Sequence, residues 1–352
     1  MSGQQMTAVV AHGAGDMRLE QRPIPEPAPG EVLVRVAYVG VCGSDLGYYR
    51  AGRVGAFAIR EPLVVGHEVV GRVETDPSGT LAAGTAVAVH PATPGEHLPG
   101  LDGRPNIWPQ SRYLGSAATL PHTQGAMSQF FSPRADQLRV LPDGLPLDRA
   151  VLAEPLGVAL HAINRAGGVG GRRLLVSGAG PVGLLVAGAA KALGARHVAV
   201  VDLFDEPLAR ARQVGADEVF RSDRDALPTG GFETVIECSG APAALTAALD
   251  AAAWGATVVQ VGILPGDARP VALAPLIARE IDLRGSFRFI DEIDHAITLL
   301  AENPSLGHVI TDVFDARDAV AAFDRASDSR ASAKVAVRFD TPASKPGVGG
   351  QA

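Results

Sequence analysis

The pattern of hydrophobic and polar positions changes twice along the chain. Up to about residue 150, short runs rich in β-branched residues are separated by turn-forming residues, which predicts strands over 6–10, 31–39, 69–74 and 85–90. Prolines at positions 23, 25, 27 and 29 predict a stiff, non-helical connector between the first two strands. We therefore expect the first part of the chain to be mostly β.

From residue 150 onward, helical and strand patterns alternate. A helix is predicted over 153–166, followed by strands over 172–177, 197–201, 234–236 and 257–261 with helices between them. This alternation is typical of a doubly wound parallel sheet. After residue 285 the pattern changes again, to helices over 290–302 and 316–326 and strands near 310 and over 334–339, which we interpret as a return to the first domain.

The fold class that follows is α/β, with a β-rich domain and a Rossmann doubly wound parallel sheet. We expect the β-rich domain over 1–154, the Rossmann domain over 155–288, the return over 289–340 and a disordered tail over 341–352. Two domains also agree with the length of 352 residues, which exceeds the usual size of one hydrophobic core.

Composition narrows the class of partner. A net charge of -7 without a cluster of Lys and Arg argues against nucleic acid, so a small molecule is the expected partner. No apolar run approaches the roughly 20 residues of a membrane span. The first residues show no secretory signal pattern, so a cytoplasmic location is expected.

Three residues with metal-binding side chains lie close together in the sequence: Cys42, His67 and Glu68. A thiolate, an imidazole and a carboxylate suit a catalytic zinc ion. Gly43 and Gly66 beside them are expected to form tight turns that bring two strand ends together. The alternative is a buried cysteine and a core histidine without a metal. Cys238, the only other cysteine, is expected to be an inert core thiol.

A long segment rich in proline and glycine, about 90–127, contains no cysteine. A loop of this length in a compact domain is usually functional or a protruding lobe. Its histidines, His90, His97 and His122, have no regular metal spacing. They are expected at the surface, or in contact with the metal ligands rather than with the metal itself. Trp108 is expected to anchor the lobe.

The segment between the strand over 172–177 and the next helix is rich in glycine and precedes an acidic residue at the end of the second strand. Its residues are Gly178, Ala179, Gly180, Pro181, Val182 and Gly183, and the acidic residue is Asp202. This G-x-G-x-x-G in a βαβ unit predicts dinucleotide binding at a helix N-terminus. A carboxylate at Asp202 favours NAD over NADP, because it would repel a 2′-phosphate and no Arg follows it. The alternative is a helix-capping aspartate.

Several motifs now occur together in the order of one family: residues 40–45, Gly66-His67-Glu68, Glu154-Pro155, residues 178–183 and Phe287-Arg288. In this the chain resembles the zinc-dependent medium-chain dehydrogenases, and within them the polyol dehydrogenase group, with loops similar to those of L-idonate 5-dehydrogenases and sorbitol dehydrogenases. The resemblance implies a GroES-like catalytic domain interrupted by the Rossmann domain, with the active site between them.

The resemblance also implies the roles of individual residues. Cys42 and His67 are expected as zinc ligands, Glu68 close enough to approach the metal, and Glu154 as a ligand directly or through water. The alternative for Glu154 is an acid that interacts with the helix dipole. Cofactor contacts are expected from the glycine-rich segment, Asp202, Val261, Gly262, Phe287 and Arg288.

Two departures from the family pattern affect these expectations. The lobe lacks the four cysteines of a structural zinc, so one catalytic zinc per subunit is expected and the lobe should be held by packing alone. Gly47 stands where the pattern C-G-S-D-x-H has a histidine of the proton relay, which leaves Ser44 as the inner hydroxyl.

The expected reaction is reversible, NAD-dependent oxidation of L-idonate to 5-keto-D-gluconate, with Arg288 and Tyr48 binding the substrate. Arg288 could instead pair with Asp291 or Glu292, and Tyr48 could simply pack. Other interpretations are a sorbitol- or xylitol-type dehydrogenase, a zinc-free quinone reductase, which Cys42, His67 and Glu154 disfavour, and a non-catalytic NAD-binding protein. A homodimer or homotetramer is expected.

Overall fold

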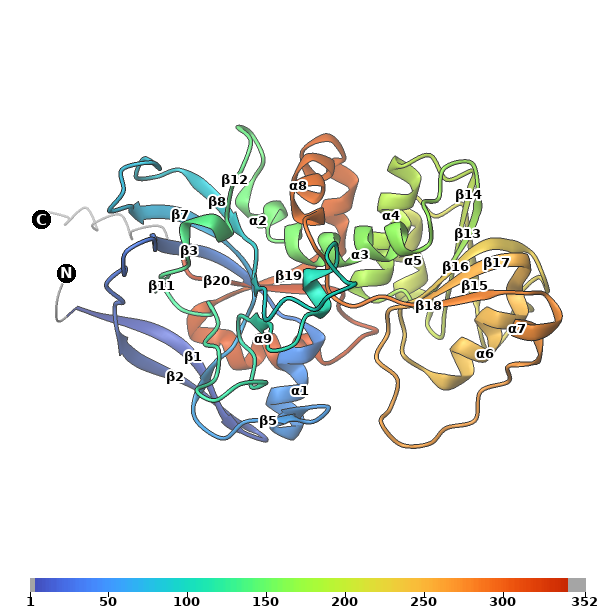
Figure 1. Ribbon diagram of the computed structural model, residues 1–352, viewed down its shortest axis with the longest axis horizontal. Helices are drawn as coiled ribbons and strands as arrows, with labels where there is room; N and C mark the ends of the chain where they lie inside the picture. Colours follow the sequence, from blue (N-terminus) through green and yellow to red (C-terminus); the bar gives the residue numbers. More distant parts are fainter. Residues whose placement is uncertain (1–3, 341–352) are drawn as a thin grey trace, which may run out of the picture.

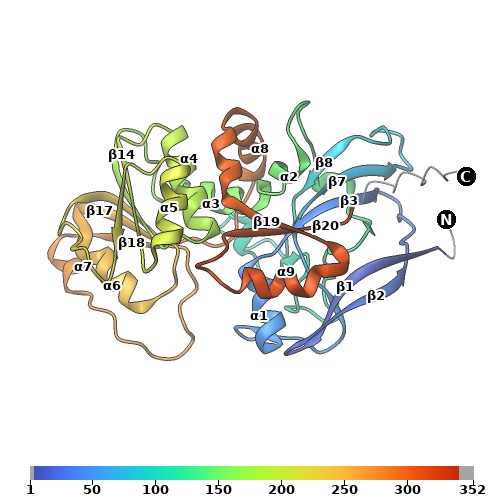
Figure 2. The same cartoon turned by 180° about the vertical axis from the view of Figure 1, so that it is seen from behind.

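The strands form two main sheets that lie side by side, one mostly antiparallel and one parallel (Figure 1). The computed structural model describes residues 4–340, so the tail expected over 341–352 lies outside the described residues. The chain begins in the antiparallel part, crosses to the parallel sheet and then returns. Its last strands lie beside the early ones in both views (Figures 1 and 2).

The larger antiparallel sheet has seven strands in the order β12-β8-β7-β3-β20-β19, with β11 also paired to β3. Their bounds are Leu33–Gly40 (β3), Glu68–Thr75 (β7), Ala86–Val89 (β8), Phe130–Phe131 (β11), Leu138–Val140 (β12), Ile310–Asp315 (β19) and Lys334–Arg338 (β20). β20 runs antiparallel to β3 and parallel to β19. The late part of the chain therefore completes a sheet that the early part begins.

A three-stranded sheet of order β2-β1-β6 lies nearby, formed by β1 (Gln5–Gly13), β2 (Asp16–Pro23) and β6 (Leu63–Val64). The remaining elements of this part are the paired strands β4 (Arg53–Val54) and β5 (Phe57–Ala58) and the helices α1 (Gly43–Ala51), α2 (Leu147–Ala150) and α9 (Ala319–Ala326). The sequence did not predict β2, because most of its residues are polar and only partly buried.

Helix α1 corrects one expectation. Gly43 does not form a tight turn but begins this helix, and a Cβ there would meet nothing within 4 Å. Cys42 is the N-cap, and the Asp45 side chain accepts a hydrogen bond from its backbone N–H. Gly66 behaves as expected, since its φ is 89° and a Cβ would lie 2.7 Å from Val39 Cγ1.

The second main sheet has six parallel strands in the order β15-β14-β13-β16-β17-β18, which confirms the doubly wound prediction. The strands are β13 (Arg173–Ser177), β14 (His197–Asp202), β15 (Glu218–Arg221), β16 (Phe232–Glu237), β17 (Ala252–Gln260) and β18 (Asp282–Gly285). The helices are α3 (Ala153–Arg165), α4 (Pro181–Ala192), α5 (Asp205–Gln213), α6 (Pro242–Ala251), α7 (Ala274–Ala278) and α8 (Glu292–Glu302). The order reverses between β13 and β16, where such sheets bind ligands at the carboxyl ends of the strands.

The segment over 90–127 contains only short elements, β9 (Ala92–Thr93), β10 (Arg112–Tyr113) and a 3-10 turn over Pro105–Ile107. The Trp108 indole donates a hydrogen bond of 2.9 Å to the Leu101 carbonyl, which links two parts of the same segment. His122 is not a surface residue: it is buried, its Nε2 accepts from Arg60 N and its Nδ1 contacts Thr119 O. The domain boundaries given above stay a prediction.

Candidate active site

The three candidate ligands from the sequence come together in the structure. The ligand atoms of Cys42, His67 and Glu68 lie within 4.8 Å of one another. Cys42 caps α1, His67 follows the Gly66 turn, and Glu68 begins β7, so the register of β3 and β7 sets their spacing. The metal hypothesis therefore has the geometry that it requires.

The electrostatics around His67 favour a positive charge. Burial alone would lower the pKa of His67, but the neighbouring Cys42 and Asp45 outweigh it and raise the pKa to about 10. The Nδ1 atom is buried without a hydrogen-bond partner among the described residues, 3.9 Å from Asp45 Oδ1. A thiol, an imidazole and a carboxylate with this preference for positive charge fit a zinc ion.

Glu154 lies in the first turn of α3, outside the group of three that meets the 4.8 Å limit. The Tyr113 hydroxyl donates a hydrogen bond of 2.6 Å to Glu154 Oε1. Burial raises the pKa of Glu154, to about 7 despite the opposing effect of His67. The role of Glu154 as a ligand stays a prediction, and the structure adds Tyr113 as the group that orients it.

The sequence reasoning missed Tyr113 as a member of the site. Its ring is edge-on to His67, with 5.4 Å between the ring centroids, and the Arg288 guanidinium lies 4.1 Å above it. Burial raises the pKa of the Tyr113 hydroxyl well above its usual value, and the nearby Glu154 raises it further. No local pattern marks this residue, because its partners are distant in the sequence.

Lys334 is a second residue that was not recognised. Its ammonium lies 2.5 and 2.7 Å from the two carboxylate oxygens of Glu68 and donates at 3.1 Å to the Val41 carbonyl. A lysine at the start of a strand that otherwise reads Val-Ala-Val was an available signal, since lysine is almost never buried without a partner. Glu68 therefore lies beside the candidate metal position but is already paired.

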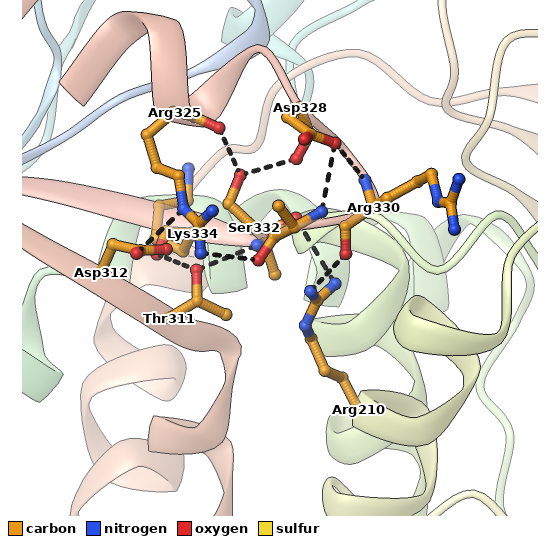
Figure 3. Close-up of polar contacts among 10 residues, drawn as sticks. Arg210, Thr311, Asp312, Arg325, Asp328, Arg330, Ser332 and Lys334 are labelled. Atoms are coloured by element: carbon orange, nitrogen blue, oxygen red, sulfur yellow. Dashed lines mark hydrogen bonds and ion pairs between the residues drawn. The ribbon is translucent and has the colours of Figure 1, made fainter. Parts of the chain in front are cut away.

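The segment before Lys334 is fixed by polar contacts from both parts of the molecule (Figure 3). The Ser332 hydroxyl contacts the Arg325 carbonyl at 2.8 Å, and Arg210 of α5 donates to the Arg330 carbonyl at 2.6 Å. These contacts join the parallel sheet to the strand that carries Lys334.

The glycine-rich loop has the shape of a dinucleotide cradle. Gly178 has a φ of 96°, and a Cβ on Gly183 would lie 1.9 Å from the Gly178 carbonyl oxygen. A Cβ on Gly180 would meet nothing within 4 Å, so this residue faces open space just before α4. A backbone loop open on that side at a helix N-terminus fits a pyrophosphate.

Asp202 ends β14 and faces this loop. Its Oδ2 accepts a hydrogen bond of 2.7 Å from Ala179 N, and its Oδ1 accepts one of 3.2 Å from Phe204 N. A pocket of about 330 Å³ beside it is lined by residues that include Gly178, Leu203 and Ser239. These bonds cap neither helix, because α4 and α5 have Gly180 and Phe204 as N-caps without a side-chain cap hydrogen bond, so the capping alternative is not supported. Asp202 borders the pocket on the side of the glycine-rich loop.

The residues that follow strands β16 and β17 lie at the same edge of the sheet as the glycine-rich loop. The N–H groups of Val261 and Gly262 both donate to the Glu237 carbonyl, at 2.8 and 3.0 Å. The Glu237 carboxylate, which the sequence reasoning also missed, accepts from Gly240 N at 3.0 Å. These bonds fix the backbone near which a nicotinamide would lie.

The predicted substrate residues differ in accessibility. Tyr48 is buried, and its hydroxyl accepts a 2.9 Å hydrogen bond from Ala117 N, which favours the packing alternative. Ser44 is partly exposed in the first turn of α1. Arg288 does not pair with Asp291 or Glu292 in the described structure: its guanidinium stacks on Tyr113 and, at 4.7 Å, on Phe287.

Two further residues, Cys238 and Gly47, were also singled out in the sequence. The Cys238 side chain is partly exposed rather than part of the core, but its burial still raises the pKa of the thiol far above the ordinary value, as expected for an inert thiol. Gly47 lies inside α1, where a Cβ would come within 2.9 Å of Val54 Cγ2 and 3.2 Å of the Arg53 carbonyl. A relay histidine at this position would therefore require β4 to shift.

Comparison with known proteins agrees with this geometry. Residues 28–143 match the model of the alcohol dehydrogenase GroES-like domain, and residues 181–302 match that of the zinc-binding dehydrogenases. Sorbitol dehydrogenase from Homo sapiens is 37% identical over 331 residues, which cover 90% of this chain and 91% of that protein. The chain belongs to the zinc-dependent medium-chain dehydrogenases.

Solved structures of this family are similar over nearly the whole chain. L-idonate 5-dehydrogenase from Escherichia coli str. K-12 substr. MG1655 has a TM-score of 0.90 and 32% identity, covering 96% of this chain and 99% of that one. A structure from Escherichia coli CFT073, described as a short chain alcohol dehydrogenase complexed with the cofactor NADH, has a TM-score of 0.85 and 25% identity, covering 96% of this chain and 100% of that one.

Family membership confirms several expectations. The chain is a zinc-dependent medium-chain dehydrogenase of the polyol group, with a GroES-like domain and a Rossmann domain, and it acts on CH–OH groups of small polyol- or sugar-type molecules. Zinc and a nicotinamide cofactor follow from the family. This membership also favours the enzyme over the non-catalytic alternative. Within residues 4–340, no helix has both the length and the hydrophobicity for a membrane span.

Proposed function

We propose that the enzyme interconverts L-idonate and 5-keto-D-gluconate with NAD, at a site formed by Cys42, His67, Glu68 and Glu154. The observation that carries this substrate is the state of Arg288, a cation at the site with no carboxylate partner in the described part of the chain. Burial lowers its pKa, so its guanidinium is already partly desolvated. A carboxylate on the substrate would supply the missing partner in a bidentate geometry that guanidinium favours.

The similarity to the E. coli L-idonate 5-dehydrogenase supports the same substrate. The similarity to sorbitol dehydrogenases supports the main alternative, a sorbitol- or xylitol-type polyol. A neutral polyol would leave Arg288 without a carboxylate in direct contact, and for this reason we favour the aldonate.

The residues of the site would have separate roles in the reaction. When bound, zinc supplies a Lewis acid for the substrate hydroxyl and the nicotinamide supplies the hydride acceptor. Arg288 would orient the carboxylate end of the substrate, and Tyr113 would hold Glu154 toward the site. The Ser44 hydroxyl, at the exposed start of α1, would accept the proton from the substrate and pass it to the cofactor ribose or to water.

NAD is the proposed cofactor because the Asp202 carboxylate lies where a 2′-phosphate would approach. One zinc ion per subunit is proposed, because the segment over 90–127 has no cysteine for a structural ion.

Self-association through the edge strand β18 is also proposed. This strand pairs only with β17 among the described strands, and the exposed apolar residues Trp254, Ile277 and Leu283 belong to the same end of the sheet. Light scattering of the wild type and of L283K would test this, since a charge on the edge should shift the protein toward the monomer.

A panel of matched substrates tests the main proposal. L-idonate, D-gluconate, sorbitol and xylitol are supplied to the zinc-loaded enzyme with NAD or NADP, and formation of the reduced cofactor is followed by absorbance. The proposal expects L-idonate with NAD to give the highest kcat/KM, and R288A to reduce that value while changing the value for xylitol much less. Turnover of xylitol or sorbitol without any turnover of L-idonate or 5-keto-D-gluconate would overturn it.

A further inference from the structure

We propose that Asn106, His161 and Glu292 form a buried polar chain that positions Arg288, and that they thereby determine specificity for an anionic substrate. This inference rests on the proposed function for the choice of substrate. The three residues come from the lobe, α3 and α8, and none of them was a candidate site residue in the sequence.

The backbone at Arg288 needs external support. Its φ is 53°, in the left-handed region that non-glycine residues seldom adopt. Such a conformation is unfavourable for a residue with a Cβ and persists where the surroundings hold it. An arginine in this conformation therefore depends on its neighbours to hold it, and the same neighbours set where its side chain begins.

Three hydrogen bonds hold the backbone on both sides of Arg288. Asn106 Nδ2 donates to the Phe287 carbonyl at 2.7 Å, and Ile290 N donates to Glu292 Oε2 at 2.6 Å. His90 Nε2 lies 2.6 Å from the Ile290 carbonyl, where it must act as the donor. The turn is therefore fixed one residue before and two residues after Arg288.

His161 connects Asn106 and Glu292, two of the residues that hold this turn. Its Nδ1 lies 2.8 Å from Glu292 Oε1, and its Nε2 lies 3.5 Å from Asn106 Nδ2. A neutral ring that donates from Nδ1 and accepts at Nε2 satisfies both contacts. Asn106 then uses one amide hydrogen for Phe287 and the other for His161, which fixes the orientation of the amide. Asn106 and His161 are 6% and 4% exposed, so water does not compete for these bonds.

The packing of the Phe289 side chain also holds this turn in place. Phe289 is buried against Gly157 of α3, where a Cβ would lie 3.3 Å from Phe289 Cγ. Its ring is also edge-on to His90, with 4.8 Å between centroids. The fixed backbone and the fixed Phe289 side chain set where the Arg288 side chain begins, and its guanidinium lies over the Tyr113 and Phe287 rings.

None of the three chain residues contacts a candidate zinc ligand or the glycine-rich loop. A substitution in the chain should therefore change substrate binding without changing binding of zinc. Asn106 bonds the carbonyl of Phe287, an expected cofactor contact, so the affinity for NADH is followed as a separate readout. This separates a positioning role from a general role in stability.

The test uses N106L, which is close in size but lacks the amide, and E292Q, which keeps the shape but removes the charge. W108F is the matched control, since it removes a hydrogen bond of similar length inside the same lobe without touching the turn. For each full-length, zinc-loaded protein, kcat and KM are measured with L-idonate and with xylitol, together with zinc content and the Kd for NADH. N106L is also combined with R288A.

N106L and E292Q should raise KM for L-idonate about tenfold, a change of the size that one lost contact produces, with kcat within about twofold. KM for xylitol and zinc content should change by less than about twofold, and W108F should resemble the wild type. In the R288A background, N106L should have little further effect, because both act through the same group.

Equal effects of N106L and W108F, or a full effect of N106L in the R288A background, would overturn the inference. If N106L does not fold, E292Q alone decides by the same criteria. A crystal structure of the folded variant separates this inference from the proposed substrate. Arg288 displaced from Tyr113 supports the positioning role even if R288A leaves KM for L-idonate unchanged, whereas an unmoved Arg288 overturns it.

Discussion

The Lys334 ammonium contacts both carboxylate oxygens of Glu68, at 2.5 and 2.7 Å, and both side chains are buried. The pair joins β20 to β7 across the β3 strand that lies between them in the sheet. A buried ion pair adds little net stability over an apolar pair, but loss of one partner leaves the other charge uncompensated.

K334M should therefore destabilise the protein strongly, by about 3–5 kcal/mol in the free energy of unfolding. The measurement is urea unfolding of the wild type and the variant at neutral pH. E68Q/K334M should recover a large part of the loss, because no unpaired charge remains. A K334M protein as stable as the wild type would show that Glu68 does not depend on Lys334.

The two cysteines provide a matched test of the metal site. C42S should remove most bound zinc and lower kcat/KM by at least about 100-fold, beyond the 10- to 100-fold cost of losing an outer hydrogen-bond partner of a metal ligand. C238S should retain both zinc and activity, since Cys238 lies outside the cluster of Cys42, His67 and Glu68. Metal analysis by mass spectrometry gives a readout that does not depend on activity. Retention of zinc by C42S would contradict the assignment.

Asp202 should determine the choice of cofactor. D202A removes the carboxylate that holds Ala179 N, so KM for NAD should rise about tenfold while KM for NADP rises less or falls. The control is D205A, which removes a nearby carboxylate that pairs with Arg221 on the surface. Steady-state kinetics with both cofactors measure the change. An unchanged NAD to NADP ratio in D202A would refute the role.

Glu292 should make a part of the stability dependent on pH. Burial alone would raise its pKa, but hydrogen bonds from His161, Ile290 N and Asn164 outweigh burial and lower the pKa to about 2 from 4.5. Because the folded pKa is the lower one, this stabilisation is present above about pH 4.5 and is lost as the pH falls toward 2. The contribution is at most about 3 kcal/mol.

Urea unfolding of the wild type and of E292Q between neutral pH and about pH 3 measures this contribution. The difference in unfolding free energy should be largest near neutrality and shrink with falling pH. The comparison between the two proteins removes the contribution of titrating groups that do not interact with Glu292. A difference that does not depend on pH would contradict the prediction.

Features that depend on neighbours in the sequence were predictable. The loop from Gly178 to Gly183 is one example, because the requirements for a turn and for close helix packing act on local residues. The start of α1 was missed, although Asp45 three residues after Cys42 was a capping signal, because cysteine is not a usual N-cap residue.

Contacts between distant residues were not predictable in the same way. Lys334 and Glu68 are 266 positions apart, and Tyr113 and Glu154 are 41 apart. No periodicity relates such residues, since their proximity follows from how the sheet and the lobe come together. The conformation of Arg288 likewise depends on the tertiary contacts of Phe287 and Ile290, so the motif predicted its importance but not its direction.

The position of β20 has a consequence for how the protein is made. This strand emerges from the ribosome among the last described residues, yet it lies between β3 and β19 inside the sheet. The elements of the parallel sheet, from α3 to β18, are synthesised as one uninterrupted block, so they can fold while the ribosome still synthesises the following residues. Glu68 then has no counter-ion until Lys334 is synthesised, so the catalytic centre is completed only after the whole parallel sheet has been made.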